Sequence, residues 1–145
     1  MDLRNYMFII IIISLYAHIP SIQGQSNDCS VAQFFRTPIG NITSPQYPGA
    51  YGHQQTCIYY IDVADASNII LNFLVFHIEY KLDFLKVGTG LQIYQNEITY
   101  VDDIDGFTGN MNVPRLVLQG GQAWIVFTTD INISEDGFYI TYSAT

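Results

Sequence analysis

Two neighbouring segments carry most of the structural information: Gly40-Asn41-Ile42-Thr43-Ser44-Pro45-Gln46-Tyr47-Pro48, and then Cys57-Ile58-Tyr59-Tyr60-Ile61. The first predicts turns at Ser44-Pro45 and at Tyr47-Pro48-Gly49, because proline fixes φ and glycine accepts positive φ. The second opens a run in which every other residue is apolar up to Val63, the alternation of a strand with one buried face. The sequence therefore indicates a β-structure punctuated by tight turns.

The rest of the chain extends this pattern. The run around Phe138, Ile140 and Tyr142 alternates in the same way. Shorter or more uniformly apolar strands are predicted at Ile69–Ile78, Phe84–Val87, Leu91–Tyr94, Leu116–Leu118 and Trp124–Thr128. Turn signals separate them at Gly88-Thr89-Gly90, Gly106 to Gly109, Gly120-Gly121 and Asp136-Gly137. Many short strands spaced by turns predict an all-β sandwich of two sheets.

The N-terminal segment predicts the compartment. A short polar start is followed by an apolar run from Met7 to Ala17, about eleven residues against the roughly 20 that span a bilayer. We interpret residues 1–24 as a secretory signal peptide cleaved after Gly24, with an uncleaved anchor helix as the alternative. Residues 25–145 then form a single domain of a secreted, extracellular protein.

Charge and cysteine content narrow the function further. The formal net charge is -8, which argues against nucleic acid and anionic lipid as partners. Cys29 and Cys57 are the only cysteines, and in a secreted chain they are most economically one structural disulfide. On the loop-entropy relation that bridge contributes roughly 3.5 kcal/mol.

Several other residues carry chemistry. Asn41 and Asn132 head Asn-x-Ser/Thr triplets, which mark exposed loops for N-glycosylation in a secreted chain. His53 and His77 are not spaced as a zinc pair, and no Gly-x-Ser-x-Gly turn is present. We therefore predict that the protein is not an enzyme. An acidic cluster at Asp102, Asp103 and Asp105 lacks the spacing of an EF-hand and is interpreted as a solvated loop.

Taken in order, the motifs resemble those of a CUB domain. The resemblance starts at Cys29 and the Gly40–Pro48 signature and ends at Gly137-Phe138 and Tyr142. Between these it runs through Ile70-Leu71-Asn72-Phe73, Phe76-His77-Ile78-Glu79, Asp83-Phe84-Leu85-Lys86-Val87 and Phe127-Thr128-Thr129-Asp130. It implies a two-sheet antiparallel jelly-roll sandwich that serves as an extracellular recognition module for proteins or glycans.

The same resemblance implies a calcium site. The matching carboxylates are Glu79, Asp83 and Asp130, and Asn132 is a weaker candidate ligand. Three carboxylates with carbonyl and water oxygens suit this hard cation. The chain departs from the family by having only Tyr80-Lys81-Leu82 where a cysteine-bearing loop is usual, with Asp105-Gly106 at the partner position. A loop this short sets a tight geometry, and Lys81 could pair with a carboxylate there.

Two functions follow from the resemblance. The first is a secreted module that binds a protein partner through calcium-ordered loops, with a partner Lys or Arg beside Asp83 and Asp130. The alternative is a calcium-free protein that binds glycans or lipid headgroups and coats membrane surfaces, similar to the single-CUB proteins of seminal plasma. The sequence leaves the oligomeric state open.

Overall fold

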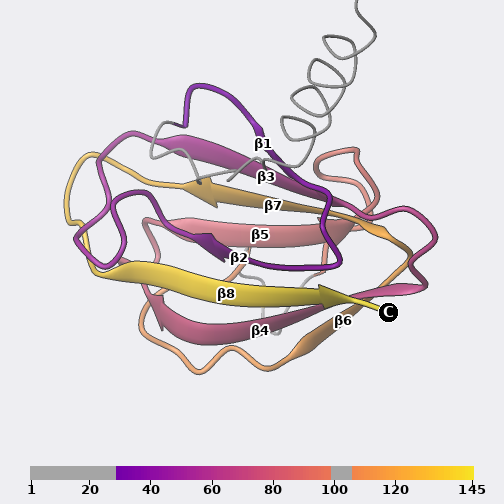
Figure 1. Ribbon diagram of the computed structural model, residues 1–145. Helices are drawn as coiled ribbons and strands as arrows, with labels where there is room; N and C mark the ends of the chain where they lie inside the picture. Colours follow the sequence, from indigo (N-terminus) through magenta and orange to yellow (C-terminus); the bar gives the residue numbers. More distant parts are fainter. Residues whose placement is uncertain (1–28, 99–105) are drawn as a thin grey trace, which may run out of the picture.

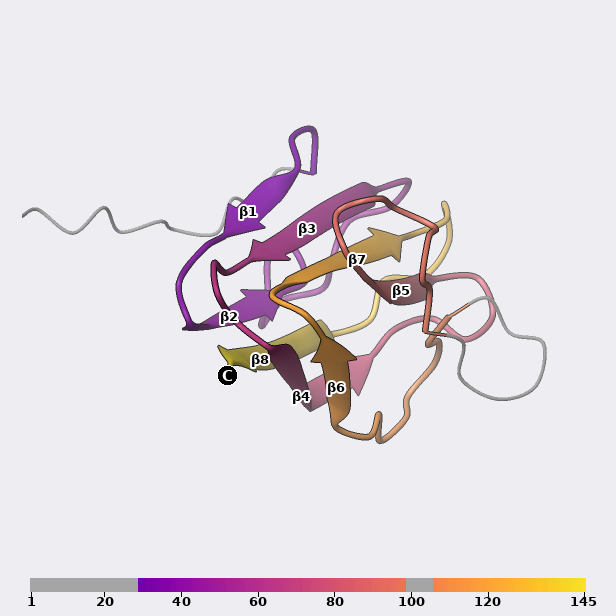
Figure 2. The same cartoon turned by 90° about the vertical axis from the view of Figure 1, so that its right-hand side faces the viewer.

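The chain folds into two sheets packed face to face. The computed structural model describes residues 29–98 and 106–145, and within them eight strands form two four-stranded sheets. The first sheet has the order β1-β3-β7-β5 and the second β2-β8-β4-β6, and Figure 2 shows them as two separate layers. The strands are β1 (Gln33–Phe35), β2 (Ile39–Thr43), β3 (Thr56–Asp62), β4 (Asn68–His77), β5 (Phe84–Thr89), β6 (Leu116–Gln119), β7 (Gln122–Thr128) and β8 (Gly137–Ala144).

The predicted sandwich is confirmed, with differences in detail. Strands β3 to β8 lie where the alternating or apolar runs predicted them. The short strands β1 and β2 were not predicted, and β1 pairs with β3 in parallel, whereas the other pairs are antiparallel. The predicted strand at Leu91–Tyr94 is wrong, because this segment forms turns and bends. The signal-peptide segment 1–24 and the cluster Asp102, Asp103 and Asp105 lie outside the described residues.

The core lies between the two layers. Inward side chains of β3, β5 and β7 meet those of β2, β4 and β8, and nearly all of them are fully buried. They include Tyr59 and Phe127 on one side, and Ile42, Leu71 and Phe138 on the other. The rings of Phe127 and Phe138 meet edge-on with centroids 5.2 Å apart, so aromatic contacts join the sheets directly.

The Ser-Pro turn at the end of β2 is locked to the start of β8. Ser44 is buried, its backbone N–H donates to Phe138 O at 3.0 Å, and its hydroxyl accepts from Phe138 N–H at 3.1 Å. Gly137 has φ +86°, and a Cβ there would collide with the Ser44 side chain. The serine of the N-terminal signature and the Gly-Phe pair near the C-terminus are therefore complementary parts of one contact.

A second close contact explains why a glycine occupies position 88, which lies inside β5 and not in the predicted Gly88-Thr89-Gly90 turn. Gly88 lies inside β5, opposite Trp124 of β7, and the indole occupies the space that a Cβ would fill. The segment that follows β5 covers the other side of the indole. Trp124 donates its indole N–H to Gln95 O at 3.0 Å, and Tyr94 contacts the ring edge-on at 6.0 Å. This packing buries Trp124 completely on the outer face of the first sheet.

The predicted disulfide is confirmed. Cys29 and Cys57 are bonded, with Cα atoms 4.5 Å apart, and the bridge ties the segment before β1 to the start of β3. The disulfide lies at the end of the sandwich where β3 begins and β7 ends, which is on the left in Figure 1. Among the described residues, the structure has no helix of the length and apolarity that a bilayer crossing requires.

Removing the bridge is expected to destabilise the domain strongly. A Cys29→Ala/Cys57→Ala double variant should lose roughly 3.5 kcal/mol of unfolding free energy. The disulfide joins residues 28 positions apart in the sequence, and without it the unfolded chain regains the conformational entropy that this closed loop removes. Urea denaturation followed by tryptophan fluorescence measures this loss. Reductant added to the wild type should lower the denaturation midpoint in the same way. A loss below about 1 kcal/mol would contradict the expected entropic contribution of this bridge.

Candidate metal site

Three acidic side chains from distant parts of the chain converge at one end of the sandwich. Glu79 lies just beyond β4, Asp83 just before β5, and Asp130 just beyond β7. One carboxylate oxygen from each lies within 4.8 Å of the others. Within the described ranges, this is the one such group of three side chains with metal-binding atoms. The structure thus brings together the three carboxylates that the sequence singled out.

The shortened loop makes this convergence feasible. Lys81 adopts φ 64° at its centre, and the backbone N–H of Asp83 faces Glu79 O at 3.4 Å, so the chain closes a single turn between the two carboxylates. Thr108 supports the turn from outside, since its hydroxyl donates to Glu79 O and accepts from Lys81 N–H. The ammonium of Lys81 lies 5.0 Å from the centroid of the Tyr80 ring. It therefore points to that ring and not to a carboxylate, the partner that the sequence suggested.

Asp83 is the buried centre of the cluster. Its side chain is 0% exposed, and both of its oxygens accept hydrogen bonds. Oδ2 accepts from the Tyr51 hydroxyl at 2.5 Å, and Oδ1 accepts from the backbone N–H of Asp130 at 2.8 Å. The Tyr51 hydroxyl in turn accepts from the backbone N–H of Glu79 at 2.9 Å. Tyr51 therefore fixes two of the three acidic residues, a role the sequence did not reveal.

The electrostatics of the cluster favour a cation. Partial desolvation raises the pKa of the Glu79 carboxyl, and the nearby carboxylates of Asp130 and Asp83 raise it further, against the opposing backbone hydrogen bond from Ile133. A cation placed among the three groups would relieve that repulsion. Burial raises the pKa of the Tyr51 hydroxyl above its usual value, so the hydroxyl stays protonated and remains a donor to Asp83.

Asn132 contacts Asp130 without turning its oxygen toward the cluster. Its backbone N–H donates to Asp130 Oδ1 at 2.8 Å, and its amide nitrogen donates to Oδ2 at 2.6 Å. Turning the amide over would present its oxygen as a further ligand. The same nitrogen is the atom that would carry a glycan, and Asn132 is exposed in the loop before β8. Asn41 is also exposed, but it lies on the edge strand β2 and not in a loop as predicted.

The histidines near this end hold loops together. His77, at the end of β4, lies 3.5 Å from Glu135 Oε2 and 3.2 Å from Asp136 Oδ2, both in the β7–β8 loop. His53 Nδ1 lies 3.3 Å from the hydroxyl of Ser134 in the same loop. These contacts anchor the β7–β8 loop beside the acidic cluster.

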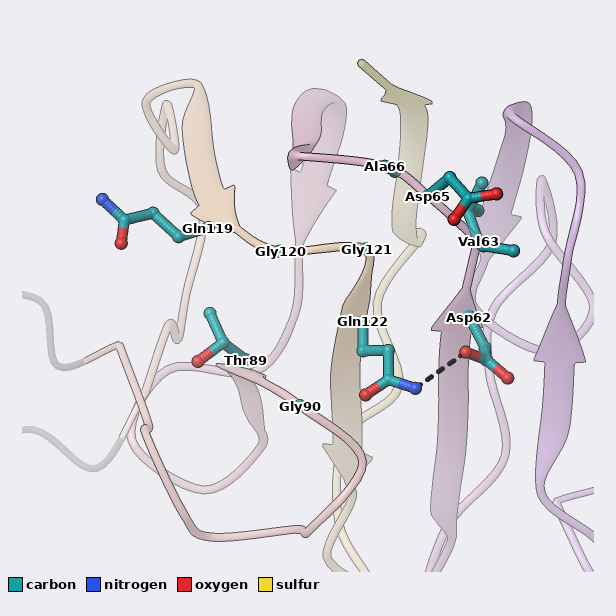
Figure 3. Close-up of a pocket in the computed structure, with 11 residues that line it drawn as sticks. Asp62, Val63, Asp65, Ala66, Thr89, Gly90, Gln119, Gly120, Gly121 and Gln122 are labelled. Carbon is teal, nitrogen blue, oxygen red and sulfur yellow. Dashed lines mark hydrogen bonds between the residues drawn. The ribbon is translucent and has the colours of Figure 1, made fainter.

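The opposite end of the sandwich holds a shallow pocket of a different kind. It has a volume of about 380 Å³ and is lined by the β3–β4 turn, the end of β5 and the β6–β7 turn. Figure 3 shows Gln122 donating to Asp62, at 2.9 Å, on one wall, with Thr89 and Gly90 facing them. Its two carboxylates, Asp62 and Asp65, have no third acidic partner in the lining. They provide a natural control for the acidic cluster.

Comparison with known proteins agrees with this architecture. The CUB domain family matches residues 29–142, and the chain belongs to that family. It is 34% identical over 124 residues to neuropilin-2 of Homo sapiens, covering 81% of this chain and 13% of that protein. It is 32% identical over 110 residues to fibropellin-1 of Strongylocentrotus purpuratus, covering 72% of this chain and 10% of that protein. The chain thus spans only about a tenth of the length of these relatives.

Two solved structures show the same fold. The second CUB domain of MASP-1, solved bound to Ca²⁺, superimposes with a TM-score of 0.64 at 25% identity, over 77% of this chain and 97% of that one. The CUB1-EGF-CUB2 fragment of rat MASP-1 gives a TM-score of 0.69 at 26% identity, over 81% of this chain and 41% of that one.

Replacing Tyr51 with phenylalanine should weaken the cluster without removing a ligand. Losing the hydroxyl leaves Asp83 Oδ2 and the Glu79 N–H without a partner, at a cost of about 1–3 kcal/mol in unfolding free energy. The affinity of the cluster for a metal ion should fall about tenfold, as expected for a group that orients a ligand. Urea denaturation and calorimetry measure the two effects. Tyr139→Phe, on the outer face of the second sheet, is the matched control and should change neither quantity.

Proposed function

We propose that this chain is a secreted, extracellular recognition module without catalytic activity, and that it binds a protein partner through loops ordered by calcium. The observation that carries the proposal is the convergence of three carboxylates, those of Glu79, Asp83 and Asp130. Asp83 is the buried member, and both of its oxygens accept hydrogen bonds. Residues 1–24 are then a signal peptide, residues 25–145 form the single domain, and Asn41 and Asn132 are candidate glycosylation sites.

The donor set supports calcium as the ion. Carboxylate, amide and backbone carbonyl oxygens are hard ligands, and calcium accepts six to eight of them in variable geometry. The similar CUB2 domain of MASP-1 was solved with Ca²⁺ bound, which supports the same assignment here. Asp83 and Asp130 would hold the ion between β5 and β7, Glu79 would hold it from the end of β4, and Asn132 could complete the set.

Calcium would act here by ordering loops. The ion would connect the Glu79–Asp83 turn to the loop that follows Asp130, and these two segments already meet through the hydrogen bond from Ile133 N–H to Glu79 Oε2. Extracellular modules bind calcium with dissociation constants of about 0.1–1 mM. At tenfold excess the ion would add only ~1.4 kcal/mol of stability by mass action, so its main effect is on loop order and not on folding.

Calcium titration of the disulfide-bonded chain tests the proposal. We expect isothermal calorimetry to give a dissociation constant of about 0.1–1 mM for one ion. An Asp62→Asn/Asp65→Asn variant, which removes the two carboxylates of the opposite pocket, should bind calcium as the wild type does. If calcium produces neither heat nor a change in melting temperature, the calcium-ordered module is excluded and the calcium-free binding of glycans or lipid headgroups becomes the better reading.

A further inference from the structure

The pocket at the end of the sandwich opposite the acidic cluster is lined by polar and small residues. Its volume of about 380 Å³ lies within the range of small-ligand sites. Among the described residues that line it, five carry a carboxylate, an amide or a hydroxyl, and the other six are glycine, alanine or valine. None of these residues is Lys, Arg or aromatic. The pocket therefore suits a small polar ligand, since an apolar molecule would leave its polar groups without partners.

Two of the polar side chains form a pair that can both accept and donate. Asp62 ends β3 and Gln122 begins β7, and the two residues are partners across these strands. The Gln122 amide nitrogen donates to Asp62 Oδ1 at 2.9 Å. This bond uses one N–H of the amide and one oxygen of the carboxylate, so each group keeps further bonding capacity. Neighbouring hydroxyl groups of one molecule, which also donate and accept, match such a pair.

Glycine leaves the main chain beside this pair uncovered. Figure 3 shows the Gly120-Gly121 turn on one side of Gln122 and Gly90 on the other. Gly90 and Gly120 have φ +80° and +88°, and a Cβ built at either of them would meet no atom within 4 Å. Both glycines thus face open space. A rigid ring can come close to the backbone here, where a side chain would keep it away.

An aromatic stack continues the surface from the pocket along the outer face of the first sheet. Tyr60 lies two residues before Asp62 on the same face of β3, about 7 Å away by strand geometry. The half-buried Tyr60 ring stacks on Phe34 of β1 with centroids 5.0 Å apart, and Phe34 is 41% exposed. The Arg36 guanidinium lies over Phe34. Aromatic ring faces are electron-rich and attract C–H groups with partial positive charge, such as those of a sugar ring.

Charge and hydrogen-bonding capacity select the class of ligand. Asp62 and Asp65 repel an acidic sugar, a phosphate or a sulfate. An ammonium group would be attracted to these carboxylates, but it only donates hydrogen bonds and would leave the amide N–H groups of Gln119 and Gln122 to water. Neutral hydroxyl groups can use the carboxylates and the amides together. The lining therefore favours an uncharged, hydroxyl-rich ring.

We propose that this pocket binds a neutral saccharide, with one sugar ring held by Asp62 and Gln122 and the adjoining ring packed against Tyr60. The site is separate from the acidic cluster, because β7 runs for seven residues, about 20 Å, from Gln122 to Thr128. Saccharide binding here needs no calcium, so it is a second function beyond the calcium-ordered one. The pocket is shallow, which limits the dissociation constant to about 1–10 mM.

NMR shift titration of the isotopically labelled, disulfide-bonded chain tests the site. The neutral probes are methyl α-mannoside, methyl β-galactoside and methyl N-acetyl-β-glucosaminide, with N-acetylneuraminic acid as the anionic control and acetyl-lysine-methylamide as the cationic one. We expect at least one neutral probe to shift the backbone amide signals of Gly90, Gly120 and Gly121, with a dissociation constant of about 1–10 mM. The affinity should be the same in calcium and in EDTA. N-acetylneuraminic acid should leave these signals unchanged.

Matched variants locate the two sugar rings. Asp62→Asn removes a charged acceptor and should weaken the best neutral probe at least about tenfold. Asp83→Asn, the same substitution at the acidic cluster, should leave that affinity within about twofold of the wild type. Adding a second neutral ring to the probe should raise its affinity about three- to tenfold, and Tyr60→Leu should abolish this gain. Tyr139→Leu, on the outer face of the second sheet, should preserve it.

Each outcome supports or overturns the saccharide site independently of calcium. If no neutral probe shifts the glycine signals, the saccharide site falls and the calcium-ordered function is untouched. Tighter binding of acetyl-lysine-methylamide than of every neutral probe would assign the pocket to a basic peptide and overturn the proposal. Saccharide binding that survives Asp62→Asn and disappears in Asp83→Asn would overturn it as well. If a neutral probe binds at the pocket and calcium does not bind at all, only the calcium-ordered function falls.

Discussion

Asp83→Asn is expected to lower calcium affinity by at least about 100-fold, the largest effect of any single change at the site. Asp83 is fully buried, and its two oxygens are oriented by the Tyr51 hydroxyl and the Asp130 N–H, so it is the best-ordered of the three carboxylates. Asparagine keeps the shape of the side chain but removes the negative charge and one acceptor atom. Calorimetric titration measures the change.

The control for this prediction is the same aspartate-to-asparagine substitution at a position outside the acidic cluster. Asp62→Asn makes the identical substitution at the opposite end of the sandwich, where Asp62 accepts a hydrogen bond from Gln122. It should bind calcium like the wild type. Calcium binding that survives Asp83→Asn and disappears in Asp62→Asn would place the ion in the pocket of Figure 3 and not at the acidic cluster.

Trp124→Ala should cost about 3–5 kcal/mol of unfolding free energy, the largest expected loss from one side chain. The indole is completely buried and fills the space above Gly88, and its N–H is satisfied by Gln95 O. Alanine leaves a cavity that the strands cannot close, together with an unpartnered carbonyl.

Chemical denaturation monitored by circular dichroism measures this loss. Tyr94→Ala is the comparison, because Tyr94 contacts the same indole from a position that is 60% exposed. It should cost under about 1.5 kcal/mol. Equal losses in the two variants would mean that the covering segment, and not the indole, provides the stability.

Sequence periodicity predicted the long strands well, but it failed for the segment after β5 that covers Trp124. In β3 and β8 the buried residues alternate, as the pattern of apolar residues indicated. At Leu91–Tyr94 the apolar residues serve a different purpose, because Tyr94, with φ 64°, covers Trp124 instead of pairing in a sheet. Periodicity registers hydrophobicity and not the surface against which a residue packs. The strands β1 and β2 were missed because one is three residues long and the other contains Gly40 and Asn41.

The candidate site was likewise predicted only in part from the sequence. Family resemblance supplied Glu79, Asp83 and Asp130, and the structure places them together. It did not supply Tyr51, which lies 32 residues before Asp83 and forms no local motif with it. The exposure of Ile131 and Ile133 was also not evident, because such residues resemble core residues in a sequence until the fold shows them exposed.

The contact between Gly88 and Trp124 also constrains how this domain can evolve. A side chain at Gly88 would collide with the indole, and this residue, unlike Gly137, has no positive φ that would itself exclude one. Substitution of Gly88 is therefore harmful only while Trp124 is present and becomes tolerable once a smaller residue has replaced it. The two positions show epistasis with a fixed order, in which the tryptophan must be lost before the glycine can vary.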